Sequence, residues 1–229
     1  MTQSISERLI LLHQRIAASE REYARVTGAV QLLAVSKTQA ADKVREAVAA
    51  GQRVFAENYL QEALEKMQAL ADEALTWHFI GPIQSNKTRQ IAAHFHWVHT
   101  IDRLKIARRL SEQRPADLPP LHVLLQVNLS QESSKAGVAL DELPALAASV
   151  NALPGLRLRG LMAIPAPETG FIAQRAVFRQ LARARDALVE AGFADCTELS
   201  MGMSQDFEAA IAEGATMIRI GTDIFGPRS

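Results

Sequence analysis

The chain has 229 residues, and its 25 lysines and arginines balance its 25 aspartates and glutamates. This length suits one domain with one sizeable core. Because a balanced charge gives no basic face for nucleic acid or anionic lipid, we expect a small-molecule partner, no nucleic acid and no membrane. The single cysteine, Cys196, excludes an internal disulfide, and residues 1–12 lack the long apolar run of a secretion signal. We therefore expect a cytoplasmic protein.

Helix-like and strand-like segments alternate along the chain. Apolar residues recur at helical spacing over residues 5–16, with Ser4 or Ser6 available as the N-cap. The uninterrupted apolar run at residues 32–35 is typical of a strand that is covered on both faces. We predict further strands at residues 53–56, 77–80, 97–101, 121–127, 156–164, 196–199 and 216–220.

Helical segments separate these strands. We predict helices at residues 40–50, 58–70, 86–93, 102–113, 141–151, 171–191 and 204–212. Gly51 is expected to end the first of them, and Asp102 to cap the helix at 102–113. Eight strands, seven intervening helices and one leading helix predict a single α/β domain over residues 1–229, a (β/α)8 TIM-like barrel.

Lys37 directly follows the first predicted strand and its Ser36. Ligands bind at the carboxyl edge of the strands in α/β barrels. The lysine is therefore either a solvated strand end or an amine held in a pocket, where it acts as a nucleophile toward carbonyl groups.

Two polar segments follow the last two predicted strands, at residues 200–204 and 221–222. Phosphate most often binds at these two loops of a barrel. Each segment has an ordinary alternative, because Ser204 would cap its helix and Gly221 would form a turn, but together they favour phosphate. Closure makes the first and last strands neighbours, so Lys37 would lie beside this phosphate. An amine beside an organic phosphate suits a Schiff base to pyridoxal phosphate, or a sugar-phosphate aldolase.

Six short motifs occur in order along the chain. They are Ala-Val-Ser-Lys at 34–37, Glu-Asn-Tyr at 57–59, Trp-His-Phe-Ile-Gly-Pro-Ile-Gln-Ser-Asn-Lys at 77–87, Gly-Leu-Met at 160–162, Leu-Ser-Met-Gly-Met-Ser at 199–204 and Arg-Ile-Gly-Thr at 219–222. Together they resemble the pyridoxal phosphate homeostasis family, the YggS/PROSC type, over nearly the whole chain. Ala56 departs from the pattern, since the family usually has glycine there. The resemblance implies a barrel of the alanine racemase N-terminal type with an extra N-terminal helix, and pyridoxal 5′-phosphate held on Lys37 as an internal aldimine.

The same resemblance implies the remaining cofactor-binding residues. Ser200, Ser204, Gly221 and Thr222 would surround the phosphate, Asn58 and His78 would line the ring pocket, Met162 would pack near the ring, and Arg219 would face the pyridine nitrogen. A guanidinium can only donate a hydrogen bond, so it would leave the ring nitrogen unprotonated and the ring a weaker electron sink.

Alanine racemases that share this barrel carry a second, β-rich domain, which supplies a tyrosine as the opposite acid/base. Here nine residues follow Ile220, and the only tyrosines are Tyr23 and Tyr59. We therefore expect no catalytic residues and no efficient catalysis. The expected function is intracellular buffering or delivery of pyridoxal phosphate, by a monomer in transient contact with apo-enzymes that need it. The alternatives are a pyridoxal phosphate-dependent racemase or aldolase, and a sugar-phosphate-binding barrel without pyridoxal.

Three histidines, His94, His96 and His99, resemble a metal cluster. Positions 94 and 99 differ in strand parity, and no carboxylate is close in sequence, so we expect no metal site. We expect His122 to be a satisfied interior histidine and Cys196 to be a core residue.

Two further residues have two interpretations each. Tyr59 either faces the pocket or packs at the start of a helix. Lys135, in the polar loop at 128–137, either hands the cofactor in and out or is simply solvated.

Overall fold

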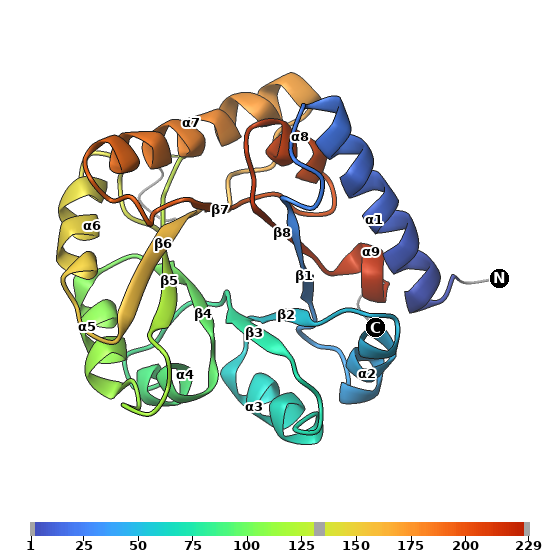
Figure 1. Ribbon diagram of the computed structural model, residues 1–229, viewed down its shortest axis with the longest axis horizontal. Helices are drawn as coiled ribbons and strands as arrows, with labels where there is room; N and C mark the ends of the chain where they lie inside the picture. The colour runs from blue at the N-terminus through green and yellow to red at the C-terminus, as the bar shows by residue number, and fades with distance from the viewer. Residues whose placement is uncertain (1–2, 131–135, 227–229) are drawn as a thin grey trace.

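Eight parallel strands close into a barrel in the order of the sequence, with helices around the outside (Figure 1). The computed structural model describes residues 3–130 and 136–226. The strands are β1 (Gln31–Val35), β2 (Val54–Glu57), β3 (Thr76–Phe79), β4 (Trp97–Ile101), β5 (Leu121–Gln126), β6 (Leu156–Met162), β7 (Glu198–Ser200) and β8 (Met217–Ile220). The helices are α1 (Ile5–Glu22), α2 (Ala41–Ala49), α3 (Leu60–Ala69), α4 (Thr88–His94), α5 (Leu104–Gln113), α6 (Leu143–Asn151), α7 (Phe171–Glu190), α8 (Phe207–Ala212) and α9 (Thr222–Phe225). The predicted (β/α)8 barrel is confirmed.

Both faces of the strands are buried, which explains why the strands are nearly continuous apolar runs. On β1, Leu32 and Ala34 belong to the large cluster between sheet and helices. The residues that alternate with them face the barrel interior, where a smaller cluster contains Leu33, Val35, Ala56, Ile80, Leu124, Met162 and Met217. The barrel is thus a packed core below its open carboxyl end.

Helix α1 covers the seam between β8 and β1. The helix that follows β8, α9, has only four residues, which is too short to cover a strand. Instead α1 buries Leu9, Leu12 and Ile16 and packs against α2, α8 and α9 (Figure 1). Its N-terminus is fixed by a capping box in which Ser4 Oγ accepts from the Glu7 N–H at 3.2 Å and the Glu7 carboxylate accepts from the Ser4 N–H at 2.8 Å.

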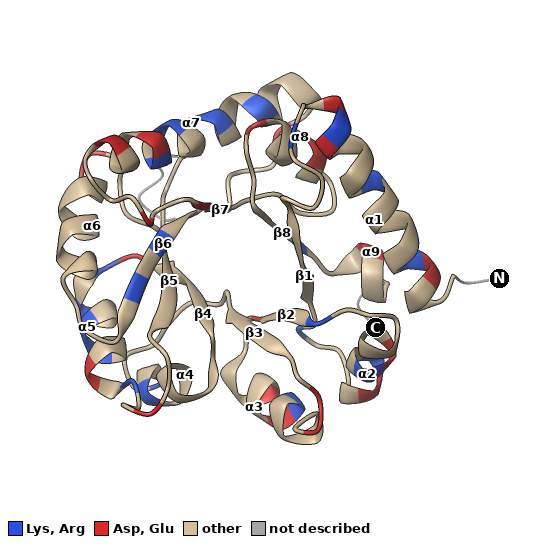
Figure 2. Cartoon of the chain, in the orientation of Figure 1, with Lys and Arg blue, Asp and Glu red and all other residues tan. Residues whose placement is uncertain are grey.

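Lysine, arginine, aspartate and glutamate residues lie mainly on the helices around the barrel (Figure 2). Strand β6 is an exception, because it carries two arginines. Arg157 pairs with Asp195 at 3.0 Å, and Arg159 pairs with Glu198 at 3.5 Å. Over residues 3–130 and 136–226, no helix is both long and apolar enough to cross a bilayer.

Five predicted helix starts, at residues 58, 86, 102, 141 and 204, lie two or three residues too early, and at two of them a capping residue was considered. Helix α5 begins at Leu104, and the Asp102 side chain accepts from the Arg103 guanidinium instead of capping the helix. Helix α8 begins at Phe207, so Ser204 lies in the turn before it, where the Asp206 carboxylate accepts from the Met203 N–H at 2.6 Å. In both places a residue type suited to capping takes part in a turn before the helix. The predicted helix end at Gly51 is confirmed, with φ 98° directly after the C-cap of α2.

Candidate functional site

A cavity of about 300 Å³ opens at the carboxyl ends of the strands. Its volume lies at the lower end of the range for small-molecule sites, about 300–1,000 Å³. It is lined by Val35, Lys37, Asn58, Ile80, Ile164, Pro165, Pro167, Glu168, Gln174, Met203, Ser204, Gln205, Asp206, Arg219, Gly221 and Thr222. The lining residues lie at or after the ends of six strands, β1, β2, β3, β6, β7 and β8, so distant parts of the sequence build the cavity together.

Barrel closure brings the two ends of the sequence together at this cavity. Strands β1 and β8 pair in parallel, with Ala34 opposite Ile220. A Cβ added at Gly221 would lie 3.1 Å from the Val35 carbonyl oxygen, so a glycine allows the close approach of these two strand ends. Lys37 and Thr222 consequently line the same cavity.

Asn58 lines the cavity from the end of β2, and its side-chain oxygen Oδ1 is buried without a hydrogen-bond partner. The segment that carries it lies against Gly81, where an added Cβ would lie 2.0 Å from the Asn58 carbonyl oxygen. The Gly81 carbonyl in turn accepts from Thr100 Oγ1 at 2.7 Å. A glycine after β3 therefore determines how deeply Asn58 is placed.

Gly81→Ala should lower the free energy of unfolding by about 1–3 kcal/mol, because the new methyl group overlaps the Asn58 backbone. Urea denaturation measures this change. Gly28→Ala is the matched control: at Gly28 φ is 80° but nothing lies within 4 Å of an added Cβ, so only the left-handed backbone costs energy, about 1 kcal/mol. Equal losses in the two variants would contradict the close approach at Gly81.

Arg219 lines the cavity and is held by two hydrogen bonds. The side chain is 4% exposed, Nη1 donates to Ser200 Oγ at 2.7 Å, and Nη2 donates to the Ala163 carbonyl at 3.0 Å. Burial lowers the pKa of Arg219 to about 10, while Asp206 acts in the opposite direction. The guanidinium therefore remains a cation at neutral pH.

A chain of buried histidines continues from Arg219 into the barrel. Ser200 Oγ lies 2.9 Å from His99 Nδ1, and His99 Nε2 lies 2.8 Å from His78 Nδ1. His78, His99 and Ser200 are completely buried. Burial lowers the pKa of His78 to about 3 and that of His99 well below its usual value, so both rings are neutral at physiological pH. The two histidines next to Ser200 are thus polar but uncharged.

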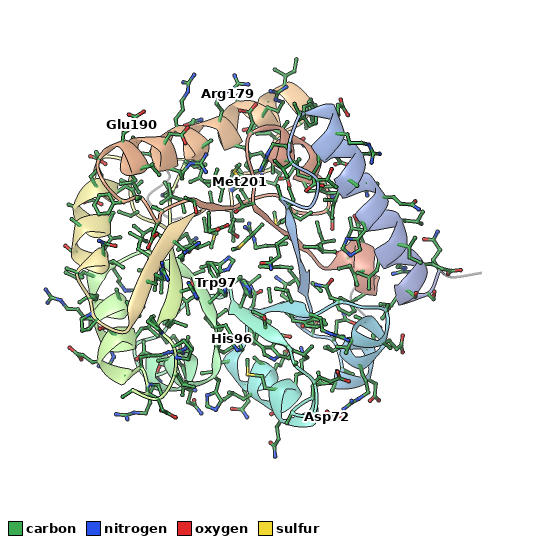
Figure 3. All side chains as sticks on the ribbon, viewed as in Figure 1. Asp72, His96, Trp97, Arg179, Glu190 and Met201 are labelled. Atoms are coloured by element: carbon green, nitrogen blue, oxygen red, sulfur yellow. The ribbon has the colours of Figure 1, made fainter. Side chains whose placement is uncertain are left out.

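The ring of Trp97 stacks between the rings of His78 and His122, and so continues this row of buried histidines. Trp97 lies inside the ring of strands in Figure 3, with its ring 5.4 Å from the His78 ring and 4.5 Å from the His122 ring. His122 Nδ1 is buried without a partner. The prediction that His122 is a satisfied interior histidine is therefore wrong, because stacking on Trp97 occupies the ring faces but not this nitrogen.

Six of the nine predicted site residues line the cavity, and the other three do not. Lys37, Asn58, Ser204, Arg219, Gly221 and Thr222 line the cavity. His78, Met162 and Ser200, on β3, β6 and β7, are completely buried and do not line it. Ser200 reaches the cavity only through its hydrogen bond with Arg219.

Several lining residues were not identified from the sequence. Ile164, Pro165, Pro167 and Glu168 come from the loop between β6 and α7, whose two prolines were the only signal. Asp206 follows β7, and burial raises the pKa of its carboxyl. It lies near Arg219 only because β7 and β8 are neighbours.

The other candidate residues have separate environments. His94 Nδ1 contacts the Gln90 carbonyl, His96 Nδ1 accepts from the Trp77 N–H, and His99 is held within the barrel. Within the described residues, no three His, Cys, Asp or Glu side chains form a potential metal site. Cys196 is 1% exposed, which confirms that it is a core residue, and burial raises the pKa of its thiol to about 11.

Neither tyrosine lines the cavity. Tyr59 is 53% exposed at the start of α3, and Tyr23 stacks on Phe171 with a centroid distance of 6.0 Å. Lys135, for which we considered a role in moving the cofactor, lies outside the described residues.

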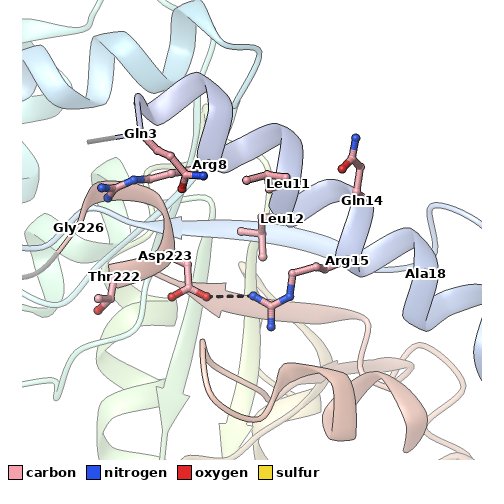
Figure 4. Close-up of a pocket in the computed structure, with 10 residues that line it drawn as sticks. All are labelled: Gln3, Arg8, Leu11, Leu12, Gln14, Arg15, Ala18, Thr222, Asp223 and Gly226. Atoms are coloured by element: carbon pink, nitrogen blue, oxygen red, sulfur yellow. Dashed lines mark ion pairs between the residues drawn. The ribbon is translucent and has the colours of Figure 1, made fainter. Parts of the chain in front are cut away.

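A larger cavity, of about 670 Å³, lies outside the barrel between α1 and α9 (Figure 4). Thr222 lines both cavities. The outer cavity contains Arg15, which pairs with Glu208 at 2.6 Å and with Asp223 at 3.5 Å. No lysine is among the described residues that line it, so the inner cavity is the better candidate despite its smaller volume.

A family model and similar proteins of known name are consistent with this barrel and cavity. The family model for the alanine racemase N-terminal domain matches residues 13–229, which defines the class of barrel. A pyridoxal phosphate homeostasis protein from Pseudomonas aeruginosa is 62% identical over 218 residues, 93% of each chain. A protein of the same name from Escherichia coli is 54% identical over 227 residues, covering 98% of this chain and 97% of that protein.

A solved relative extends the comparison to structure. PipY from Synechococcus elongatus, solved with PLP bound, is 41% identical and superposes with a TM-score of 0.84, covering 97% of this chain and 100% of PipY. The chain belongs to the pyridoxal phosphate homeostasis protein family.

Proposed function

We propose that this protein binds pyridoxal 5′-phosphate in the inner cavity, attached to Lys37 as a Schiff base, and that it buffers or delivers the cofactor. The observation that carries the proposal is the presence of Lys37 in one cavity with Ser204, Gly221 and Thr222. PipY, solved with PLP bound, and relatives named pyridoxal phosphate homeostasis protein support it.

The lining residues fit this cofactor. Gly221 lines the cavity without a side chain of its own, and the Ser204 and Thr222 hydroxyls supply hydrogen-bond donors. The unpartnered Oδ1 of Asn58 is a buried acceptor that needs a donor from a ligand or water. The cavity wall therefore offers groups for a phosphate and for a polar ring substituent.

Each residue has a distinct part in this proposal. Pyridoxal phosphate supplies an aldehyde, which condenses with a primary amine. Lys37 supplies that amine and thereby keeps the aldehyde from modifying other proteins. Arg219 lines the cavity, is held by Ser200 and the Ala163 carbonyl, and would offer only hydrogen-bond donors to a bound ring. Such a donor keeps a ring nitrogen unprotonated and weakens the ring as an electron sink.

In this proposal the protein carries the cofactor and does not catalyse a reaction efficiently. Racemisation needs an acid/base on both faces of the bound amino acid. Tyr59 points to solvent and Tyr23 packs on Phe171, so neither is available at the cavity. The proposal includes a cytoplasmic monomer that meets pyridoxal phosphate-dependent apo-enzymes transiently.

The absorption spectrum of the purified protein, before and after borohydride, tests the proposal. We expect a yellow protein whose visible band disappears on reduction, with the reduced cofactor found by mass spectrometry on the peptide that contains Lys37. A colourless protein that cannot be reconstituted with pyridoxal phosphate would overturn it. Exchange of an amino acid α-proton for deuterium at turnover rates would instead identify a racemase or an aldolase.

A further inference from the structure

Both peptide groups that flank Lys37 are held by charged side chains from the neighbouring strand-helix unit. On one side, the Ser36 carbonyl accepts a hydrogen bond from Lys66 Nζ at 2.6 Å. On the other side, the Thr38 N–H donates to the Glu62 carboxylate at 2.8 Å. Lys37 is therefore the single residue between two fixed points of the backbone.

One buried cation joins the two sides of this arrangement. Lys66 Nζ lies 2.7 Å from Glu57 Oε1 and 3.5 Å from Glu62 Oε2. Glu57 Oε1 also accepts from Ser36 Oγ at 2.6 Å. The side chains of Glu57 and Lys66 are 0% and 6% exposed, whereas that of Glu62 is 38% exposed. We call Glu57, Glu62 and Lys66 the ion cluster.

The backbone next to Lys37 adopts a conformation that needs such support. Thr38 has φ 63°, and Ala24 is the only other described non-glycine residue with positive φ. For a β-branched residue the left-handed region costs about 1–2 kcal/mol. The hydrogen bond to Glu62 offsets part of this cost, and the sharp turn places Lys37 at the corner where β1 ends.

The ion cluster and the inner cavity lie on opposite sides of this turn. Lys37 lines the inner cavity. Thr38, Glu62 and Lys66 line a different surface depression, which is also distinct from the cavity between α1 and α9, and Lys37 does not line it. Glu57 and Lys66 are not among the lining residues of the inner cavity. The ion cluster therefore acts on the inner cavity through the backbone of residues 36–38, which it holds directly, and, from Glu57, through the adjoining Asn58.

We propose that Glu57, Glu62 and Lys66 are positioning residues, which fix the peptide groups on either side of Lys37 and so direct its amine into the cavity. This inference rests on the proposed function, in which the neutral amine adds to the aldehyde carbon. The nitrogen loses two protons, the oxygen leaves as water, and a C=N bond replaces C=O, so no oxidant or reductant is needed. Stability alone is a poor explanation, because burying an ion pair seldom stabilises a protein more than apolar residues would.

The main test compares Glu62→Met with Glu65→Met, since Glu65 lies on the same helix and contacts Gln61 instead of the turn. Two measurements are made. Hydrogen exchange of the Thr38 amide is followed in the protein without cofactor, and the rate of Schiff base formation is followed by visible absorbance. Glu62→Met should accelerate the exchange and slow Schiff base formation about tenfold or more, because a small misplacement of a reacting group has a large effect on rate. Glu65→Met should change neither.

Two further measurements separate positioning from loss of the site. Binding of pyridoxine 5′-phosphate, which has no aldehyde, should change less than about twofold in Glu62→Met, since the phosphate loops are intact. Glu62→Gln, which keeps an oxygen acceptor for Thr38, should restore most of the exchange protection and most of the rate. Wild-type rates and wild-type Thr38 protection in Glu62→Met would overturn the inference. If wild-type protein forms no Schiff base, the proposed function fails, whereas the Thr38 exchange result still reports on the turn.

Discussion

Lys37→Ala should abolish both the visible absorbance of the protein with pyridoxal phosphate and the adduct that borohydride fixes. The reason is geometric: Lys37 is the only lysine among the described residues that line the inner cavity. Absorbance titration and mass spectrometry of the reduced protein measure the two losses. Pyridoxine 5′-phosphate should still bind to Lys37→Ala, because Ser204, Gly221 and Thr222 do not depend on the amine.

Lys43→Ala is the matched control for this experiment. Lys43 is an exposed residue of α2, close in sequence to Lys37 but outside the cavity. Its replacement should leave the absorbance and the adduct unchanged. A wild-type adduct yield in Lys37→Ala, or its loss in Lys43→Ala, would show that the cofactor binds elsewhere.

The free energy of unfolding should decrease as the pH is lowered from about 7 to about 5. Burial lowers the pKa of His78 from 6.5 to about 3 and lowers that of His99 in the same direction. Below pH 6.5 the unfolded chain therefore binds protons that the folded chain does not bind. The stability due to the neutral rings is fully present above pH 6.5 and is lost as the pH falls toward the folded pKa. Each histidine should contribute about 1 kcal/mol per pH unit within this window.

Urea denaturation at the two pH values measures the decrease. His78→Asn should reduce the slope with pH, because it removes one of the rings whose pKa burial lowers. Burial raises the pKa of Glu57 and of Asp206, and these carboxyls contribute with the opposite sign, so the comparison of variants isolates the histidine. A stability that is equal or greater at the lower pH in both wild type and His78→Asn would contradict the account of the buried chain.

The positions of Lys37 and of the loops after β7 and β8 were predictable, and the groups that orient Lys37 were not. A lysine after an apolar run and a Gly-Thr after the last strand are local signals, and barrel closure relates them by topology alone. By contrast, Glu57, Asn58 and Tyr59 were read as one motif. In the structure Glu57 holds Ser36, Asn58 lines the cavity and Tyr59 faces solvent. The three residues are adjacent in sequence, so the motif alone could not show that their side chains lie in three different environments.

The sequence by itself determined the alternation of eight strands with helices, the leading helix and the lysine at the end of β1, because these depend on short-range periodicity and burial. Only the tertiary structure decided that Ser200 joins His99 across 101 residues, and that Lys66 holds the carbonyl of Ser36 across 30 residues. Such contacts depend on strand register and on the closure of the barrel. They set the environment of the cavity, while leaving no trace in the local pattern of residues.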